Sequence, residues 1–507
     1  MANKNAYHLS LRRWLTFVVA SLLLSLSGQA QSHATARAEV LLTKNQRVTN
    51  FVSNKHGALV LRTDNYKREH RDPKRTLITF DTALYQTGST NFNLPFRQKL
   101  WDAFGSEERL HVLYFDQRFG AYTLVHVDPI QHSLDTFTAQ LPKNYEPVQY
   151  LIFSHFGAFI LRNKKELALH IVDLESKQSY TAPIVGKEGE NNVEIKQFQS
   201  MYNGQEMCLI YSQHWGAQQN LFIRTFNSDG LIEEEYNMLN QQPKVISIQA
   251  VRVEADLRFF GTCSAYETGA YSTGIYTSTN NWQENASFNP RSFIDFKNYL
   301  NYLPENQQYL IKSRQDKRAV KGKETEWSAL ILPGTLMFSS DRIWLYGLAF
   351  EPTQRSMVTT TTINGRSVVG SKDVFDGYLF THLFVQEFDQ NGFYLNDYSM
   401  PVRIYPKPMD LTLPVHALVL DTSLALLYHN ENELLSAEIY SDSLYKFQPS
   451  YVQQMHDGDQ LQLMNSNLNT WGEKAYLMHG FQRIKNKEDE DIQRMRDVYF
   501  IQKIERE

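Results

Sequence analysis

The chain has little of what would point directly to one class of protein. Its 507 residues include only two cysteines, so neither a disulfide framework nor a cysteine-based zinc module is expected. After the N-terminal segment, no apolar run reaches the roughly 20 residues that a membrane-spanning helix needs. The HExxH, Cys-x-x-Cys, P-loop, GxSxG and EF-hand motifs are also absent. We therefore expect no cofactor and no metal, and no motif names a catalytic residue.

Charge of one sign is not in large excess either. The chain has 51 Lys and Arg residues against 55 Asp and Glu residues. Proteins that bind nucleic acid usually carry a strong basic excess, so we expect no nucleic acid partner. Hydrophobic residues make up 42% of the chain and aromatic residues 13%, which is enough for a large folded core.

The N-terminus has the pattern of an export signal. Three basic residues precede an apolar stretch over residues 14–26, and residues 28–30 supply small side chains at a cleavage site. We predict a signal peptide over residues 1–30, cleaved near Ala30, with Ala36 and Ala38 as alternatives. The mature protein is then expected in the periplasm, at the cell surface or outside the cell.

A β-strand pattern recurs along the mature chain. An apolar run ends in a small polar or acidic residue and is followed by a turn, and such runs end at Asp81, Asp128, Asp173, Asn227 and Asp389. The first three intervals are 47, 45 and 54 residues. A period of about 40–50 residues with several strands per unit is typical of a β-propeller. The sequence therefore predicts an all-β fold whose units bury their faces against one another.

The repeats divide the chain into blades of up to four strands. The last repeat lacks its fourth strand, and the segment AEVLLTK at Ala38–Lys44 is left over at the other end. Donating that strand to the last blade would close the ring and remove exposed sheet edges. We therefore predict one propeller domain over residues 38–507, with eight blades, or seven if a terminal unit is irregular. The predicted blades span 47–95, 98–142, 146–186, 193–240, 244–290, 327–402, 408–455 and 459–507.

Cysteine and histidine residues do not form an evident cluster. Cys208 and Cys263 fall on equivalent strands of neighbouring repeats, which leaves a disulfide conceivable, but buried free thiols are the simpler interpretation. His56, His155 and His214 each precede a Gly-Ala turn in a different repeat. We interpret these three histidines as turn residues rather than as a metal set.

A first insertion interrupts the rhythm at about residues 291–326. Apolar residues recur at helical spacing from Phe293 to Leu303, so we predict a helical insertion between blades five and six. Its second half is basic, and such a cluster could hold an anionic polysaccharide, a lipid headgroup or an acidic protein. The alternative is a solvated helix partly neutralised by nearby acidic residues. The candidate binding residues are Lys312, Arg314, Lys317, Arg318 and Lys321.

A second insertion at about residues 357–371 lies inside the sixth blade. Residues 359–363 and 366–369 flank Asn364-Gly365, a pair that favours the type I′ turn of a β-hairpin. We predict a projecting hairpin with Asn364 and Arg366 as candidate binding residues. Projecting loops on rigid scaffolds often bind partners, although an idle ornament fits the sequence equally well.

Five segments in the last third of the chain form a recognisable set: DVFDGY at 373–378, Thr381-His382, FDQNG at 388–392, HGFQRIKNK at 479–487 and VYFIQKI at 498–504. In these segments the chain resembles a group of uncharacterised exported proteins of Bacteroidota. Asn396-Asp397 departs from the Trp-Asp that is usual there. The resemblance implies an exported envelope protein and carries no catalytic residues across, because no activity is known for that group.

Two classes of function remain open. The first is a non-enzymatic binding or interaction propeller of the bacterial cell envelope, with a protein, peptide or glycan as partner. The second is a hydrolase or lyase acting on polysaccharide, which needs two facing carboxyl groups about 5–9.5 Å apart. A propeller scaffold serves both, so the fold alone does not decide.

Overall fold

The protein is described here by a computed structural model, and the predicted signal peptide at residues 1–30 lies outside the described residues. The structure describes residues 32–64, 74–92, 94, 97–106, 108–164, 166–184, 193–201, 204–215, 218–238, 244–253, 256–266, 270–278, 288–322, 327–339, 341–363, 366–404, 407–430, 433–440, 443–446, 450–451, 455–472, 474–488 and 493–506.

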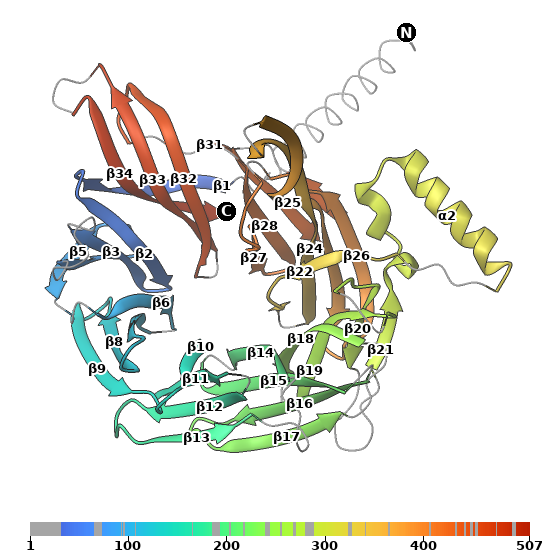
Figure 1. The fold of residues 1–507 in the computed structure, drawn as a ribbon, viewed down its shortest axis with the longest axis horizontal. Coiled ribbons are helices and arrows are strands. Elements are labelled where there is room, and N and C mark those ends of the chain that lie inside the picture. The colour runs from blue at the N-terminus through green and yellow to red at the C-terminus, as the bar shows by residue number, and fades with distance from the viewer. Residues whose placement is uncertain are drawn as a thin grey trace, which may run out of the picture.

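The described strands form eight antiparallel sheets, each with four strands in its main path. Figure 1 shows the sheets arranged around a central axis as the blades of a propeller. Where neighbouring blades meet near the axis, the first strand of one contacts the first strand of the next, as at β2 and β6 or β10 and β14. The predicted all-β propeller is confirmed, with eight blades in the described part of the chain.

The first four blades follow one another without interruption. Blade one contains β2 (Gln46–Asn54), β3 (Gly57–Asp64), β4 (Arg75–Phe80) and β5 (Gln86–Phe92). Blade two contains β6 (Lys99–Gly105), β7 (Leu110–Asp116), β8 (Ala121–Asp128) and β9 (Ser133–Gln140). Blade three contains β10 (Glu146–Phe153), β11 (Phe156–Asn163), β12 (Glu166–Asp173) and β13 (Ser179–Pro183). Blade four contains β14 (Val193–Met201), β15 (Glu206–Trp215), β16 (Gln218–Phe226) and β17 (Ile232–Met238).

The last four blades include the insertions and the closing strand. Blade five contains β18 (Lys244–Val253), β19 (Asp256–Ser264), β20 (Gly274–Ser278) and β21 (Phe288–Ser292). Blade six contains β22 (Leu330–Pro333), β23 (Met337–Phe338), β24 (Arg342–Ile363), β25 (Arg366–Asp389) and β26 (Tyr394–Pro401). Blade seven contains β27 (Val415–Leu420), β28 (Ser423–Asn430), β29 (Glu433–Tyr440), β30 (Ser443–Lys446) and β31 (Ser450–Tyr451). Blade eight contains β32 (Asp459–Trp471), β33 (Ala475–Asn486), β34 (Met495–Arg506) and β1 (Ser32–Leu42).

Apolar runs mark the middle strands because neighbouring blades cover both of their faces. All residues of β4 and β7 are buried, whereas β13 at the rim is mostly exposed. Each gap between adjacent blades, including the gap between blades eight and one, holds a cluster of buried apolar side chains. Cys208 and Cys263 are free thiols buried in the cluster between blades four and five. The core of this protein is therefore a ring of inter-blade seams rather than one central mass.

The N-terminal strand closes the ring as predicted. β1 pairs with β34 from Ser32 opposite Arg506 to Leu42 opposite Asp497, so it begins six residues before the predicted Ala38. Buried charges tie this strand into blade eight. Arg496 donates to Asp459 of β32 at 2.8 and 2.6 Å and to Glu39 of β1 at 3.3 Å.

The first insertion is helical, as predicted, but its elements differ from the expected ones. The apolar residues at helical spacing form two short 3-10 turns, η2 (Phe293–Asp295) and η3 (Tyr299–Tyr302), which pack into the seam between blades five and six. The α-helix, α2 (Glu305–Ala319), begins only after Pro304. Proline lacks an N–H and so fits the start of a helix, where that donor would have no partner.

The insertion is anchored by one buried carboxylate. Asp397 of β26 accepts hydrogen bonds from the backbone N–H groups of Lys297 and Asn298, at 3.1 and 2.8 Å, and from the Tyr394 hydroxyl. The side chain of Asn298 also donates to the Asp397 carbonyl at 2.8 Å. This carboxylate therefore fixes the path of the chain between η2 and η3.

Candidate functional site

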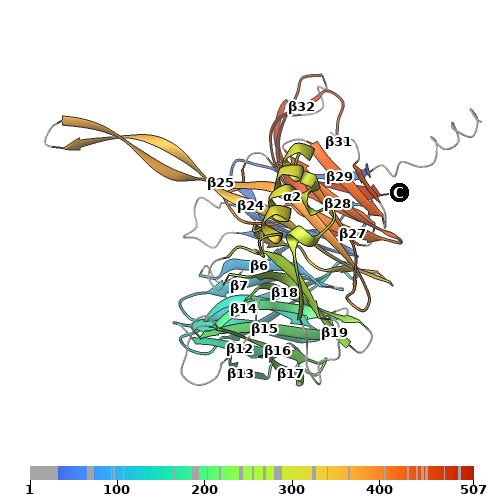
Figure 2. The same ribbon diagram turned by 90° about the vertical axis from the view of Figure 1, so that its right-hand side faces the viewer.

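The predicted hairpin at 357–371 is the outer part of a longer two-stranded ribbon. The sheet partner β22 pairs with β24 only as far as Phe350, and β26 pairs with β25 only from His382 onward. Between these limits, residues 351–363 and 366–379 pair only with each other among the described residues. We call this ribbon the arm. Figure 2 shows it extending far out of the ring, on one side of the propeller.

The hairpin has two candidate binding residues. Asn364 is outside the described residues. The backbone of Arg366 pairs with that of Ile363 at the outer end of the arm, while its side chain is not described. The structure therefore places the backbone of Arg366 away from the ring, and binding by either residue stays a prediction.

The base of the arm is firmly held. Gly377 has a φ of 92°, and a Cβ there would come within 2.9 Å of Lys407 and of the Pro408 carbonyl, so this position needs glycine. The Tyr378 N–H donates to the Pro408 carbonyl at 2.9 Å, and Lys407 bonds to Asp376 at 3.0 Å. A segment from outside blade six thus clamps the arm where it leaves the sheet.

The outer arm exposes apolar side chains on one face. The register places Phe375 opposite Gln354, Ser371 opposite Val358 and Val369 opposite Thr360, so these six residues share a face. On it, Val358 is 75% exposed, Val369 69% and Phe375 40%. A free ribbon of this length, with apolar residues and two unpaired edges, is a template for pairing with another chain.

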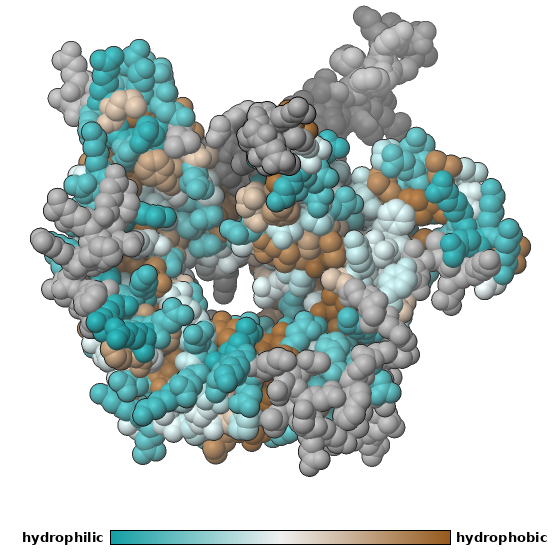
Figure 3. Space-filling view, viewed as in Figure 1, coloured by the Kyte–Doolittle hydropathy of each residue, from teal (hydrophilic) through white to brown (hydrophobic). Residues whose placement is uncertain are grey.

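The basic residues of the first insertion lie on α2 or just after it, and all five are exposed. Arg314, Lys317, Arg318 and Lys321 follow i, i+3, i+4, i+7 spacing and so share one side of the helix. Lys312 falls on the other side. Figure 3 shows α2 at the edge of the molecule, with a mostly hydrophilic surface. Anion binding by these residues stays a prediction.

A large cavity lies at one mouth of the central channel, which Figure 3 shows as an opening between the blades. It has a volume of about 1410 Å³ and is lined by the first turns of blades one to four and by Gly472 of blade eight. Because strands alternate in direction, these first turns lie at the end of the propeller opposite to the tip of the arm. The cavity lining includes the carboxylates Asp102, Glu108, Asp135 and Glu175 and the rings Phe104, Phe137, Tyr150 and Phe153.

A row of polar residues crosses blade two beside this cavity. His111 of β7 lies directly opposite His126 of β8, which in turn lies opposite Asp135 of β9. The two Nδ1 atoms are 2.9 Å apart, and His111 Nε2 lies 2.9 Å from Ser106 Oγ. Both histidines are over nine-tenths buried, and Phe104 stacks on His111.

Burial sets the protonation of this row. It lowers the pKa of His111 well below the usual value, and it lowers that of His126 to about 4, with Arg109 acting in the same direction and Asp135 opposing. Both rings are then neutral near pH 7. One of them must carry its proton on Nδ1 and the other on Nε2 for the Nδ1–Nδ1 hydrogen bond to form.

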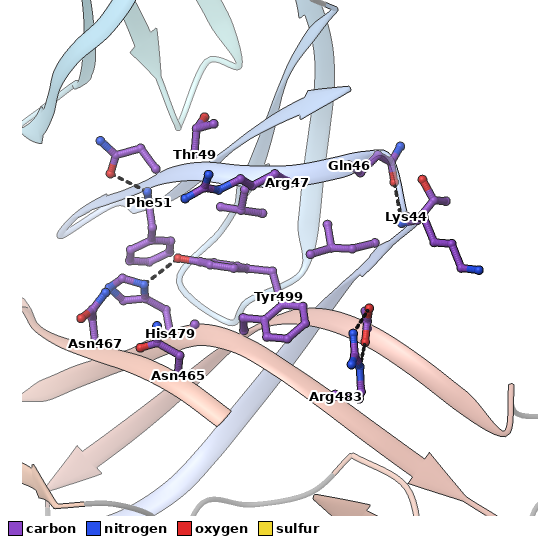
Figure 4. A pocket seen from close by; sticks show the side chains of 17 residues that line it. Lys44, Gln46, Arg47, Thr49, Phe51, Asn465, Asn467, His479, Arg483 and Tyr499 are labelled. Atoms are coloured by element: carbon purple, nitrogen blue, oxygen red, sulfur yellow. Dashed lines mark hydrogen bonds and ion pairs between the residues drawn. The ribbon is translucent and has the colours of Figure 1, made fainter. Parts of the chain in front are cut away.

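The second cavity, of about 680 Å³, lies where blades eight and one meet. Figure 4 shows the ring of Phe51 against His479, whose Nδ1 bonds to the Tyr499 hydroxyl at 2.7 Å. Burial lowers the pKa of His479 to about 3, so the ring is neutral and its hydrogen bond is structural in character. Arg47, Asn465 and other polar side chains line the opening.

The site row was missed from the sequence because no short motif contains it. His111, His126 and Asp135 are 15 and 9 residues apart, and only the pairing of three strands aligns them. The predicted blade at 98–142 contains all three residues, but the sequence does not show which of its residues lie opposite one another. In the described side-chain arrangement, no three His, Cys, Asp or Glu residues are gathered as a ready metal site.

None of the described helices is long and apolar enough to cross a membrane. This finding agrees with the absence of a second long apolar run in the sequence.

Comparisons with known proteins give only distant likenesses. No protein-family model and no curated protein matches the chain. Among solved structures, the chain is similar to dihydro-heme d1 dehydrogenase NirN in complex with DHE, with 9% identity, a TM-score of 0.40, and 94% of this chain and 79% of that chain covered. It is similar to the β-propeller domain of the Trilobed protease from Pyrococcus furiosus, with 8% identity, a TM-score of 0.34, and 80% and 96% covered.

Acylaminoacyl peptidase from Pyrococcus horikoshii is a third similar structure, with 9% identity, a TM-score of 0.35, and 89% of this chain covered. This chain spans 59% of that peptidase and 55% of a prolyl endopeptidase. The chain is an all-β propeller, and likeness at this level says nothing of activity.

Proposed function

We propose that this protein is an exported, non-enzymatic propeller of the bacterial cell envelope that binds another polypeptide through the arm. The observation that carries the proposal is that, in the described part of the chain, residues 351–363 and 366–379 pair with each other alone. A two-stranded ribbon is marginally stable by itself in water, so an isolated ribbon with exposed valines is more useful as a binding element than as a structural one.

Strand addition fits this geometry. The arm has a free edge on each strand, and a partner strand can continue its hydrogen-bond ladder while side-chain contacts with Val358, Val369 and Phe375 provide specificity. The clamp at Asp376 and Lys407 holds the base, which lowers the entropic cost of presenting the ribbon.

The export part of the proposal rests on the N-terminal sequence and on the closing strand. Cleavage after Ala30 would leave Ser32–Leu42 whole, whereas cleavage at Ala36 or Ala38 would remove part of β1. N-terminal sequencing of the protein from a cell envelope fraction tests this directly, and a start beyond Ser32 would contradict it.

A photo-crosslinking experiment tests the arm. A benzophenone amino acid replaces Val358 in one variant and Tyr309 in a control, since Tyr309 is an equally exposed residue on α2. We expect crosslinks to one protein from position 358 and not from position 309. The double variant Val358→Lys and Val369→Lys should lose the partner without unfolding. Equal capture by this variant, or crosslinks that require α2, would contradict the proposal.

A polysaccharide-acting hydrolase or lyase is the second candidate. It is favoured by the carboxylates and aromatic rings of the channel-mouth cavity, and burial raises the pKa of Asp102, as a general acid requires. Release of reducing ends from envelope polysaccharides, abolished by Asp102→Asn, would support this activity. No release from any glycan fraction would remove it.

A further inference from the structure

The row across blade two has the composition of a metal site. His111, His126 and Asp135 occupy directly opposed positions on three adjacent strands, so their side chains leave the same face of the sheet. Directly opposed residues have Cβ atoms about 4.5–5.5 Å apart. Two imidazoles and one carboxylate at this spacing form the donor set of many octahedral transition-metal sites.

The spacing of the two imidazoles suits one ion. Two nitrogen ligands at about 2.1 Å from a metal, at right angles to each other, are roughly 3.0 Å apart. The Nδ1 atoms of His111 and His126 are already 2.9 Å apart. A turn of the two rings, with the Nδ1 proton of one ring moving to its own Nε2, would therefore let both Nδ1 atoms face one metal ion.

An outer hydrogen bond is also in place. A histidine that ligates through Nδ1 keeps its proton on Nε2, and metal sites usually give that N–H an acceptor. His111 Nε2 lies 2.9 Å from Ser106 Oγ, and the Phe104 ring stacks on the imidazole. Asp135 is exposed to the cavity and can rotate toward His126, while the nearby Arg109 is exposed and free to turn into solvent.

From this arrangement we infer that His111, His126 and Asp135 bind one divalent first-row transition-metal ion at the mouth of the channel, with cavity water completing its coordination. The site lies at the opposite end of the propeller from the arm, so it adds to partner binding and does not depend on it.

Titration of the full mature chain with Co²⁺, after treatment with a chelator, tests the site. We expect one equivalent to bind, with a visible spectrum of an octahedral ion and two exchangeable, hyperfine-shifted proton signals in the NMR spectrum, one from each Nε2–H. Ser106→Ala should weaken binding about 10- to 100-fold, as loss of an outer-shell partner does elsewhere. Asp135→Asn and His126→Gln should weaken it further.

Two controls keep the outcome clear. His155→Gln removes another histidine of the same cavity that lies on blade three, and it should leave Co²⁺ binding unchanged. The proton signals are measured on the unmodified protein. They therefore test the role of His111 without a His111 variant, which could fail to fold. Absence of the two signals, or binding that survives His126→Gln and is lost in His155→Gln, would overturn the inference.

Discussion

Blade eight and the arm are built from similar long antiparallel strands, yet they differ in what surrounds them. In blade eight, β32, β33 and β34 are 13, 12 and 12 residues long, and β1 covers the outer edge. In the arm, no further strand covers either edge within the described residues. The first arrangement buries Arg496, Asp459 and Glu39 together, whereas the second leaves valines in water.

This difference separates the part of the molecule that supports the fold from the part for which we propose binding. Blade eight joins the two ends of the described chain, so its buried contacts support the whole ring. The arm covers no seam, so its residues have no comparable structural role. Substitutions of the same chemical kind should therefore have very different effects in the two regions.

The largest effect is expected for Arg496→Met. The substitution leaves the side chain of Asp459, 0% exposed, without its main cation. It also removes one of the two arginines that bind Glu39, the other being Arg37. Breaking a buried ion pair by removing one partner costs about 3–5 kcal/mol. Urea unfolding should show this loss in the free energy of unfolding.

The matched control is Arg355→Met in the arm, where the arginine is 65% exposed and pairs with Asp376 at 3.4 Å. It should change the free energy of unfolding by no more than about 1 kcal/mol. The double variant Arg496→Met with Asp459→Leu should recover much of the lost stability, because no buried carboxylate is then left unpaired. Equal effects of Arg496→Met and Arg355→Met would contradict the conclusion that blade eight supports the fold and the arm does not.

The ion pairs of blade eight should also make the free energy of unfolding depend on pH, and we expect an effect of intermediate size. Burial opposes ionisation of Asp459, but hydrogen bonds from Arg496 and Asn486 outweigh it and hold the pKa of Asp459 below its usual value. A lowered folded-state pKa gives stability that is present above about pH 4 and is lost as pH falls through the folded pKa. The stability difference between wild type and the double variant should therefore shrink below pH 4 in urea unfolding, and a constant difference would count against the role of Asp459.

A smaller effect is expected at the base of the arm. Asp376 is 30% exposed and bonds to Lys407, so Asp376→Asn should cost about 0–1 kcal/mol. Hydrogen exchange should nevertheless quicken at the Tyr378 amide, which bonds to the same segment at Pro408. Unchanged exchange there would show that the backbone contacts alone hold the arm.

The propeller ring could be predicted from the sequence because every blade repeats the same local pattern of residues. Each buried middle strand is a short apolar run, such as LHVLYFD at 110–116, and each run is followed by a turn. The insertion was harder, since Phe293 and Tyr299 have helical spacing but are drawn into the seam between blades five and six. Burial against the neighbouring blades overrode the local pattern, and the α-helix formed from the polar residues after Pro304 instead.

The candidate sites were less predictable from the sequence. They depend on how neighbouring strands are aligned and on where the outer strands of a sheet stop pairing. The sequence marks Asn364-Gly365 as a turn, but the length of the free ribbon depends on where β22 and β26 stop pairing. The row from His111 to Asp135 depends likewise on the alignment of three strands. A one-residue slip in either hairpin would turn these side chains to the opposite face.

The smallest effect on stability is expected from shortening the arm. Residues 355–374 are replaced by Asn-Gly, so that the paired residues Gln354 and Phe375 flank a two-residue hairpin turn. The contact of Phe375 with Tyr378 and the clamp at Lys407 remain. The free energy of unfolding should stay within about 0.5 kcal/mol of wild type, as for surface changes away from packed regions. A clear loss of stability would mean that the arm supports the ring, and the contrast between the arm and blade eight would then fail.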